Sequence, residues 1–220
     1  MPEIAKELGV PVGIIVTMGT NDVAAAHAGA GNEKSGQILN TAGSSDMISI
    51  LTDKPVVNPC YYVRNAGRLG IWQIYATTCG GFAIDWFHKE FCSEMSKEYF
   101  YDEFLPNSIE QIDDNPLSFD PYLAEDRQSM EKKKASWHGL SLSSTREQMM
   151  AALLYSMQKV LSDTVDEAGR QITMEKIIKT TGGLLSDPML HLKEDIFDGY
   201  RFEVLDDCTI RGNYVLARQF

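Results

Sequence analysis

Residues 16–26, VTMGTNDVAAA, decide the fold because they predict a strand that passes directly into a helix. The apolar run at 13–18 is short and rich in β-branched residues, and a proline and a glycine bound it, which is typical of a buried strand. Asn21 and Asp22 precede an alanine-rich run, as residues at a helix N-terminus do. The pattern predicts an α/β protein.

Asp22 is therefore placed where a strand passes into a helix. In open α/β sheets ligands bind at that edge. A carboxylate there can accept a proton from an incoming hydroxyl. The alternative is that Asp22 only caps its helix, and this stretch by itself leaves both roles open.

The composition indicates a soluble globular protein that can bury a sizeable core, with 220 residues, 44% hydrophobic and 23% charged. Asp and Glu outnumber Lys and Arg by 31 to 20, and the net charge is -11. This charge argues against nucleic acid or an anionic membrane as the main partner. A phosphorylated nucleotide stays compatible, since backbone N–H groups and helix N-termini can hold its phosphates.

Cysteines and histidines show no metal-binding or disulfide spacing. The cysteines, Cys60, Cys79, Cys92 and Cys208, are expected to be free, buried thiols in a reducing cytosol. The four histidines fall in separate segments, so each is expected to be structural. We find no signal peptide and no stretch of membrane-spanning length, which predicts a cytoplasmic protein without a membrane partner.

A glycine-containing turn is predicted between two strands in residues 37–51. Gly43 can adopt positive φ, and Ser44 and Ser45 follow it in the turn. A turn of small residues between strands exposes N–H and hydroxyl donors, which suits a phosphate. An ordinary hairpin turn is the alternative.

Two glycine pairs precede predicted helices. The pair at 80–81 begins a helix that carries Asp85, and the pair at 182–183 follows a strand predicted at 171–178. Asp187 is expected to cap the helix after the second pair. Glycines at a helix start allow a ligand to approach the backbone closely, and close packing is the alternative.

The most regular helix is predicted at 143–163, where Ser144 and Glu147 have the spacing of a capping box. Residues 93–143 are the least regular part, and we expect an irregular excursion from the domain there. Further elements are expected at 2–9, 61–63, 71–75, 202–204 and 212–217.

A series of motifs then occurs in a fixed order along the chain. These are GTNDVAA at 19–25, NTAGSS at 40–45, Gly81 with Asp85-Trp86, PYLAEDR at 121–127, WHGL at 137–140, Gly182-Gly183, and GNYVLA at 212–217. The ordered set resembles the carboxy-terminal domain of the FGGY carbohydrate kinases, a family that includes glycerol, xylulose, ribulose and gluconate kinases. The resemblance covers essentially all 220 residues and implies a single domain at 1–220.

The resemblance implies a ribonuclease-H-like fold, shared with actin and the sugar kinases, in which a mixed sheet is flanked by helices. In the family two such domains close on a cleft, with ATP mainly on the carboxy-terminal domain and sugar mainly on the amino-terminal one. The implied activity is transfer of the γ-phosphate of ATP to a hydroxyl of a sugar or polyol.

The resemblance also implies roles for single residues. Asp22 would be the general base that takes the proton from the attacking sugar hydroxyl. Mg²⁺ would bridge the phosphates, with Asp22 close by. ATP would be contacted by Gly19, Gly43, Ser44, Ser45, Gly81, Asp85, Gly182, Gly183 and Asp187.

The family's amino-terminal half, with the first phosphate-binding turn and most sugar contacts, has no counterpart in residues 1–220. The chain alone is therefore expected to be inactive and to need that half as a partner. We expect it to be an excised domain, a truncated gene product or one partner of a split enzyme, and apolar surface left bare is expected to favour a homo-oligomer. The alternative is a non-catalytic nucleotide-binding or interaction module. Asp85 and Asp187 favour it, because they add negative charge beside the nucleotide.

Overall fold

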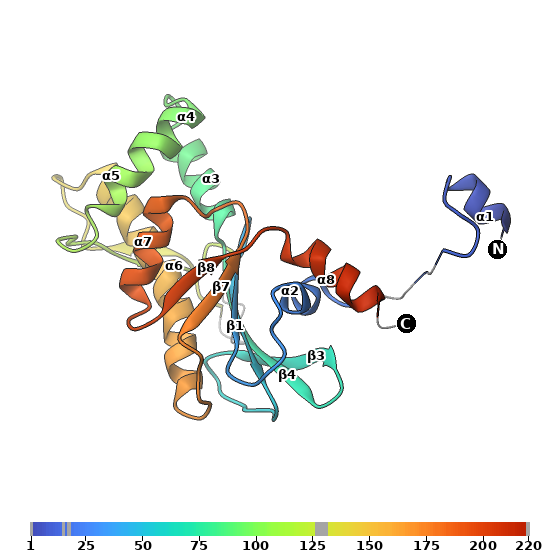
Figure 1. The fold of residues 1–220 in the computed structure, drawn as a ribbon. Coiled ribbons are helices and arrows are strands. Elements are labelled where there is room, and N and C mark those ends of the chain that lie inside the picture. The colour runs from blue at the N-terminus through green and yellow to red at the C-terminus, as the bar shows by residue number, and fades with distance from the viewer. Residues whose placement is uncertain (1, 15, 17–18, 126–131, 219–220) are drawn as a thin grey trace.

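The computed structural model describes residues 2–14, 16, 19–125 and 132–218, and contains a mixed six-stranded sheet with helices on both faces (Figure 1). The predicted α/β class is confirmed. The strands of this sheet are β1 (Ile38–Ala42), β2 (Asp46–Thr52), β3 (Tyr62–Arg68), β4 (Ile71–Thr78), β7 (Ile177–Thr181) and β8 (Arg201–Val204). A second sheet pairs β5 (Ser118–Asp120) with β6 (Ser136–His138).

The strand order is β3-β4-β2-β1-β7-β8. The hairpin predicted around residues 43–45 is confirmed, because β1 and β2 pair antiparallel with Ala42 opposite Asp46. β4 also runs antiparallel to β2, whereas β7 and β8 join the other side in parallel. The carboxyl ends of β1, β4, β7 and β8 therefore share one edge of the sheet with the start of β2.

β3 is one of the two outer strands of the sheet, and it is interrupted. Its register against β4 shifts between Asn65 and Arg68, and Gly67 within this bulge has φ of 77°. A side chain at Gly67 would lie 2.5 Å from the Thr20 hydroxyl. The bulge therefore brings β3 close to the segment that leads into the helix carrying Asp22.

Helices cover the two faces of the sheet differently. Helices α6 and α7 lie on one face, and α2 and α8 lie on the other (Figure 1). The bounds are α1 (Pro2–Glu7), α2 (Asp22–Gly29), α3 (Gly81–Phe91), α4 (Lys97–Tyr99), a π-helix (Phe100–Phe104), α5 (Leu105–Ile109), α6 (Arg146–Gly169), α7 (Asp187–Ile196) and α8 (Cys208–Ala217).

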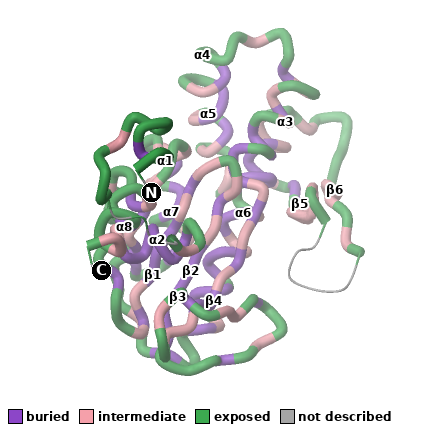
Figure 2. Tube along the Cα trace, turned by 90° about the vertical axis from the view of Figure 1, so that its right-hand side faces the viewer, coloured by how far each residue is buried: buried purple, intermediate pink, exposed green. Residues whose placement is uncertain are grey.

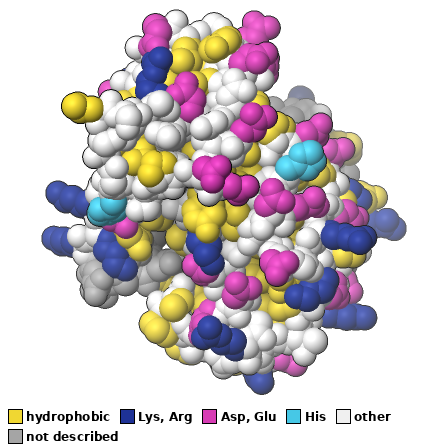
Figure 3. Space-filling model, turned by 90° about the vertical axis from the view of Figure 1, so that its left-hand side faces the viewer, with side chains coloured by type: hydrophobic (Ala, Val, Ile, Leu, Met, Phe, Trp, Pro, Cys, Tyr) yellow, Lys and Arg dark blue, Asp and Glu magenta, His cyan; other side chains and the backbone are white. Residues whose placement is uncertain are grey.

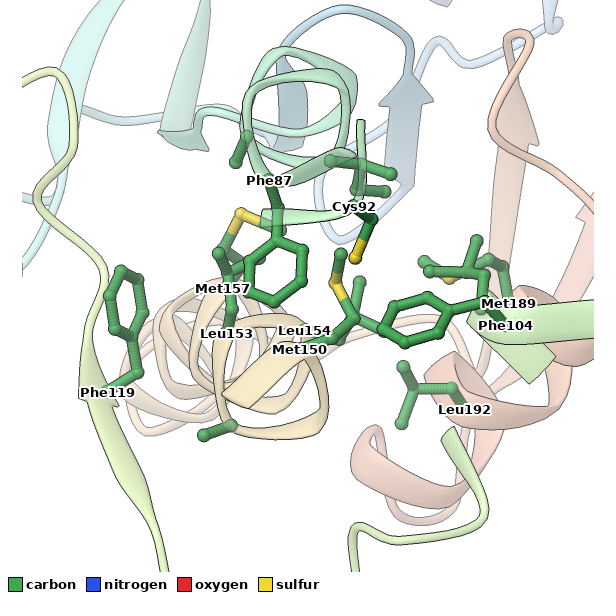
Figure 4. Packing of buried hydrophobic residues seen from close by; sticks show 14 of the residues in the cluster. Phe87, Cys92, Phe104, Phe119, Met150, Leu153, Leu154, Met157, Met189 and Leu192 are labelled. Atoms are coloured by element: carbon green, nitrogen blue, oxygen red, sulfur yellow. The ribbon is translucent and has the colours of Figure 1, made fainter. Parts of the chain in front are cut away.

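α6 is the helix around which most of the core packs. Met150, Leu153, Leu154 and Met157 are almost fully buried among side chains of α3, α5 and α7, and Phe87 of α3 packs over them (Figure 4). Toward the C-terminal end of the same helix, a second cluster of buried apolar side chains packs against the sheet. Figure 2 shows the buried residues concentrated in β1, β2, β4 and α6, whereas α1 is mostly exposed.

The capping box of α6 differs from the prediction by one residue. Thr145, not Ser144, is the N-cap, and it exchanges hydrogen bonds with Gln148. The Ser144 hydroxyl instead accepts from the Ser141 N–H in the preceding turn. Two overlapping matches to the same motif occur in the sequence, and the second of them forms the capping box, whereas Ser144 of the first stabilises the preceding turn.

Three predicted segments differ from the structure. Gly13, Ile14 and Val16 are exposed and lie outside any strand, because none of the described strands pairs with them, while positions 15, 17 and 18 lie outside the described residues. The strand predicted at 171–178 begins only at Ile177, since residues 171–172 close the last turn of α6. The excursion at 93–143 is not irregular throughout: it holds α4, the π-helix, α5 and β5–β6, and its positions 126–131 lie outside the described residues, including the end of the PYLAEDR motif.

No described helix is both long and apolar enough to cross a membrane. On the face shown in Figure 3, Lys and Arg side chains are interspersed with acidic ones and form no separate basic area. The expectation that nucleic acid is not a partner stays a prediction. The cysteines among the described residues are free, as predicted, but only Cys92 and Cys208 are buried, whereas Cys79 is half-buried and Cys60 is exposed.

α2 and α8 cross at two glycines. A Cβ atom built on Gly29 would lie 1.9 Å from the Cys208 carbonyl oxygen, and one on Gly212 would lie 1.7 Å from the Ala25 carbonyl oxygen. Backbone atoms cannot move away as a flexible side chain can, so only glycine permits this distance. The small residues of α2 thus allow α8 to lie directly against the helix that begins at Asp22.

Gly212→Ala is expected to lower the free energy of unfolding by about 3 kcal/mol, because the added methyl group forces the two helices apart. Urea unfolding measures the change. Gly169→Ala is the matched control: this glycine ends α6, and its nearest neighbour atom would be Met174 Cγ at 3.8 Å. The control should be neutral or stabilise by roughly 0.5–1 kcal/mol. Equal effects of the two substitutions would contradict the proposed helix contact.

Candidate functional site

A cleft of about 380 Å³ opens at the edge where the carboxyl ends of the strands meet. Asp22, Gly43, Ser45 and Gly182 all line it, so four of the residues singled out from the sequence lie in one place. The remaining lining is Val23, Thr41, Met47, Thr77, Thr181, Asp207, Cys208, Thr209 and Ile210. Hydroxyl groups and two carboxylates dominate the polar lining, and none of the described lining residues is Lys or Arg.

Asp22 is the first residue of α2 and does not cap it. The N-cap is Asn21, whose Oδ1 accepts from the Ala24 N–H at 3.0 Å and from Arg64 Nη2 at 3.4 Å. Within the described residues, Asp22 Oδ1 accepts only from the adjacent Val23 N–H, at 2.9 Å. The interpretation that Asp22 serves as the cap is therefore wrong. Because Asn21 supplies that hydrogen bond, the Asp22 carboxylate remains directed at the cleft.

The turn at 43–45 is held from outside the hairpin by the start of α3. Gly81 N–H donates to the Gly43 carbonyl oxygen at 3.0 Å, and Phe82 N–H donates to the Ser44 carbonyl oxygen at 2.9 Å. Gly80 has φ of 49°, and a side chain there would lie 2.5 Å from the Asp46 nitrogen. Gly81 thus supports the turn and does not line the cleft in this structure.

Gly182 brings the end of β7 against the end of β1. Its φ is 131°, and a Cβ atom would lie 2.1 Å from the Ala42 carbonyl oxygen. The same carbonyl accepts from the Leu184 N–H at 3.0 Å. A Cβ atom on Gly183 would meet nothing within 4 Å. Only the first glycine of the pair is therefore required by packing.

The other residues predicted to contact nucleotide lie outside this cleft. Gly19, Ser44, Gly183 and Asp187 are exposed, and the N-cap of α7 is Ser186, with Asp187 as the first helical residue. The expectation that Asp187 caps α7 is therefore wrong, because Ser186 occupies the extended position before the helix.

Asp85 faces a different hollow of about 480 Å³, together with His88, Lys89 and Lys97. It accepts a hydrogen bond from the Tyr101 hydroxyl at 2.9 Å. Burial and this bond raise the pKa of Tyr101 to about 12. The negative charge of Asp85 is thus directed at neighbouring basic side chains and away from the Asp22 cleft.

Known kinases resemble the chain in sequence and in fold. Over 208 residues it is 23% identical to the xylulose kinase of Bacillus subtilis, covering 90% of this chain and 40% of that protein. Over 217 residues it is 26% identical to the gluconokinase of the same organism, with 90% and 41% covered. No family model matches the chain.

Solved structures share the fold. The ligand-bound xylulose kinase of Lactobacillus acidophilus superposes with a TM-score of 0.83 at 21% identity, covering 99% of this chain and 45% of that one. The glycerol kinase of Plasmodium falciparum, solved with ADP, gives a TM-score of 0.72 at 17% identity, with 90% and 42% covered.

The chain is homologous to FGGY-type sugar kinases. It spans about two fifths of the length of the curated relatives that it matches, which corresponds to one domain of such a kinase. The predicted mixed sheet flanked by helices matches the sugar kinase domains.

Asp207 and four threonines line the cleft but were not singled out from the sequence. Asp207 follows β8 and has φ of 42°, in the left-handed region, and its side chain makes no capping hydrogen bond to α8. Thr41, Thr77 and Thr181 lie at the ends of β1, β4 and β7. A sequence signal exists, since each follows an apolar strand, but only the strand order shows that these ends meet.

Metal binding by side chains alone is not supported in the described part of the domain, where no group of three or more His, Cys, Asp or Glu could hold an ion. Asp22 and Asp207 are the acidic residues of the cleft. Any divalent cation there would need further ligands from a bound molecule, such as phosphate oxygens.

His27 lies on α2 and is fully buried behind Asp22. Its Nδ1 accepts from Asn32 Nδ2 at 3.2 Å, so the neutral ring carries its proton on Nε2 and donates to Ser49 Oγ at 2.5 Å. Burial, together with the positive charges of Arg64, Arg68 and Lys179, lowers the pKa of His27 from 6.5 to about 3. His27 is therefore neutral in the folded protein and anchors α2, as the expected structural role requires.

This pKa predicts that acid destabilises the domain. The unfolded chain binds a proton at His27 below pH 6.5, but the folded protein does so only near pH 3, so stability falls as the pH drops through this window. Between pH 7 and pH 5 the loss is about 2 kcal/mol. Urea unfolding at both pH values should show a smaller loss for His27→Gln than for the wild type. The same loss in both proteins would contradict the prediction.

Proposed function

We propose that the chain is the carboxy-terminal, nucleotide-binding domain of an ATP-dependent carbohydrate kinase, with Asp22 as the general base. The observation that carries the proposal is that Asp22, the Gly43–Ser45 turn and Gly182 line one cleft at the carboxyl ends of the strands. Homology to sugar kinases over the length of one domain supports it.

The cleft suits a triphosphate without basic side chains. A Cβ atom on Gly43 would meet only the Ser45 carbonyl oxygen, at 3.8 Å, so the surface of the turn stays open to a phosphate. Hydroxyls of Ser45, Thr41 and Thr181 face the same space and can donate to phosphate oxygens. When bound, Mg-ATP supplies the phosphoryl group and the cation that offsets the negative charge.

Asp22 would accept the proton from the substrate hydroxyl as that oxygen attacks. Its carboxylate is suited to this because the capping hydrogen bond is made by Asn21 instead. Helix α2 is fixed by α8 at Gly29 and Gly212 and by His27, so the carboxylate has a rigid base. A sugar or polyol is the proposed substrate, and the amino-terminal kinase half is the proposed partner that completes the site.

Asp22→Asn is expected to lower sugar-dependent ADP formation by about 10³-fold, since the amide cannot accept the proton. The assay supplies the amino-terminal half of a homologous gluconokinase and tests a panel of sugars and polyols. Mg-ATP binding, measured by calorimetry, should change little. Asp198→Asn, an exposed acid remote from the cleft lining, is the control and should keep wild-type turnover. Wild-type turnover in Asp22→Asn would refute the base role.

A non-catalytic nucleotide-binding module is the second candidate. The observation that favours a module without turnover is the exposure of Asp187 and the separation of Asp85 from the cleft, because a nucleotide that binds through fewer of the expected contacts is held less firmly for phosphoryl transfer. Mg-ATP binding without turnover, after the amino-terminal half has been supplied, would select this candidate.

Asp207→Asn is expected to weaken the dependence of ATP binding on Mg²⁺. Two carboxylates in one cleft repel the phosphates, and this repulsion is strongest for ATP without Mg²⁺. Removing one charge should therefore lower the dissociation constant without Mg²⁺, divided by that with Mg²⁺, by about tenfold. Asparagine tolerates the left-handed conformation, so the fold should be kept. Asp206→Asn is the matched control, because this neighbour does not line the cleft. An unchanged ratio in Asp207→Asn would contradict the prediction.

A further inference from the structure

An ion pair lies fully buried beneath the turn at 43–45. Lys193 Nζ of α7 lies 2.6 Å from Asp46 Oδ2, and the two side chains are 0% and 1% exposed. Asp46 is the residue directly after Ser45 and begins β2. The pair therefore reaches the turn from the opposite face of the sheet to α2.

Every charged atom of the pair has further partners. Gln158 Nε2 of α6 donates to Asp46 Oδ2 at 2.9 Å, and Lys193 Nζ donates to Gln158 Oε1 at 2.8 Å. The other carboxylate oxygen, Asp46 Oδ1, accepts from Asn40 Nδ2 at 2.6 Å. One carboxylate thus joins α6, α7 and both strands that flank the turn.

The network extends to the second turn that lines the cleft. Asn40 Oδ1 accepts from Thr180 Oγ1 at 2.8 Å, and Thr180 lies in β7 two residues before Gly182. Asn40 Nδ2 also donates to the Met47 carbonyl oxygen at 3.0 Å, which fixes its orientation. The 43–45 turn and the start of the 182–183 turn are therefore linked by three side chains.

Stability alone does not account for such a pair. Removing two charges from water costs several kcal/mol per ion, and apolar residues of similar size often stabilise a core equally well or better. What charged hydrogen bonds add is direction, because they hold only at short distances and suitable angles. In this network the hydrogen bonds fix the course of the backbone on either side of the 43–45 turn.

We propose that Lys193 and Asp46 are positioning residues that fix the 43–45 turn relative to the 182–183 turn and thereby set the affinity for a nucleoside triphosphate. The inference rests on the proposed function for its ligand, but not for its geometry. The geometry can be tested without a ligand by amide hydrogen exchange, because the Gly81 and Phe82 amides donate to carbonyl oxygens of the same turn.

The test is the double variant Asp46→Asn/Lys193→Met, which removes both charges while roughly keeping side-chain volume. It should stay folded, because no unpaired charge is left buried. Amide hydrogen exchange should quicken at Gly81 and Phe82 by about tenfold or more. The dissociation constant of Mg-ATP should rise by about tenfold, which corresponds to 1.4 kcal/mol. Lys193→Met alone should be less stable than the double variant, since it leaves the Asp46 carboxylate buried without its cation.

Thr164→Ala is the matched control. This buried hydroxyl donates to the Val160 carbonyl oxygen at 2.9 Å within α6, away from the turn. The substitution should lower the melting temperature without changing nucleotide affinity or the exchange of the two amides. A merely structural role for the ion pair predicts the same result for the double variant.

The proposed function and the positioning role of the ion pair would be refuted by different results. If the wild-type chain binds no Mg-ATP, the proposed function fails, while amide exchange at Gly81 and Phe82 still decides the positioning role. If the double variant is folded and its two amides exchange at the wild-type rate, the positioning role is overturned, whatever the nucleotide does. Faster exchange with unchanged nucleotide affinity would overturn the link between the turn and binding.

Discussion

The Asp46 carboxylate is the group on which the arrangement of the cleft depends. It accepts hydrogen bonds from β1, α6 and α7, and it follows directly on the turn that lines the cleft. A buried carboxylate must have its lone pairs satisfied, so a shift of any one partner leaves a costly unpaired charge. The β1–β2 hairpin, α6 and α7 are therefore held together as one unit, and this unit keeps the turn at 43–45 rigid.

A different constraint fixes the other side of the cleft. Where α2 and α8 cross, backbone meets backbone at Gly29 and Gly212, and no side chain separates them. The polar network and the glycine crossing act on opposite faces of the sheet, and the strand ends lie between them. Asp22 begins α2 and Asp207 directly precedes α8, whereas Ser45 and Gly182 lie in turns next to the strands of the network. The cleft is thus assembled from two rigid halves within one domain.

Local sequence patterns predicted the local features. The helix after Asn21, the hairpin around Gly43 and the helix after the glycine pair at 80–81 follow from apolar periodicity and turn chemistry, and all are present. Contacts between residues far apart in the sequence could not be predicted from it. Asp46 and Lys193 are 147 residues apart, and Thr77 and Thr181 line the same cleft because β2 and β1 join their strands in one sheet. The strand expected at 13–18 shows the same limit, because an apolar run becomes a strand only where a ladder partner exists.

The bulge in β3 has a consequence for contacts between copies of the chain. An outer strand offers unpaired N–H and carbonyl groups to any extended segment, and a long regular one invites continuation of the sheet into a neighbouring molecule. Here the register slips between Asn65 and Arg68, and the guanidinium groups of Arg64 and Arg68 lie along the same strand. Strand-to-strand polymerisation is therefore disfavoured at this border of the sheet, and contacts between copies across β3 have to be made by side chains.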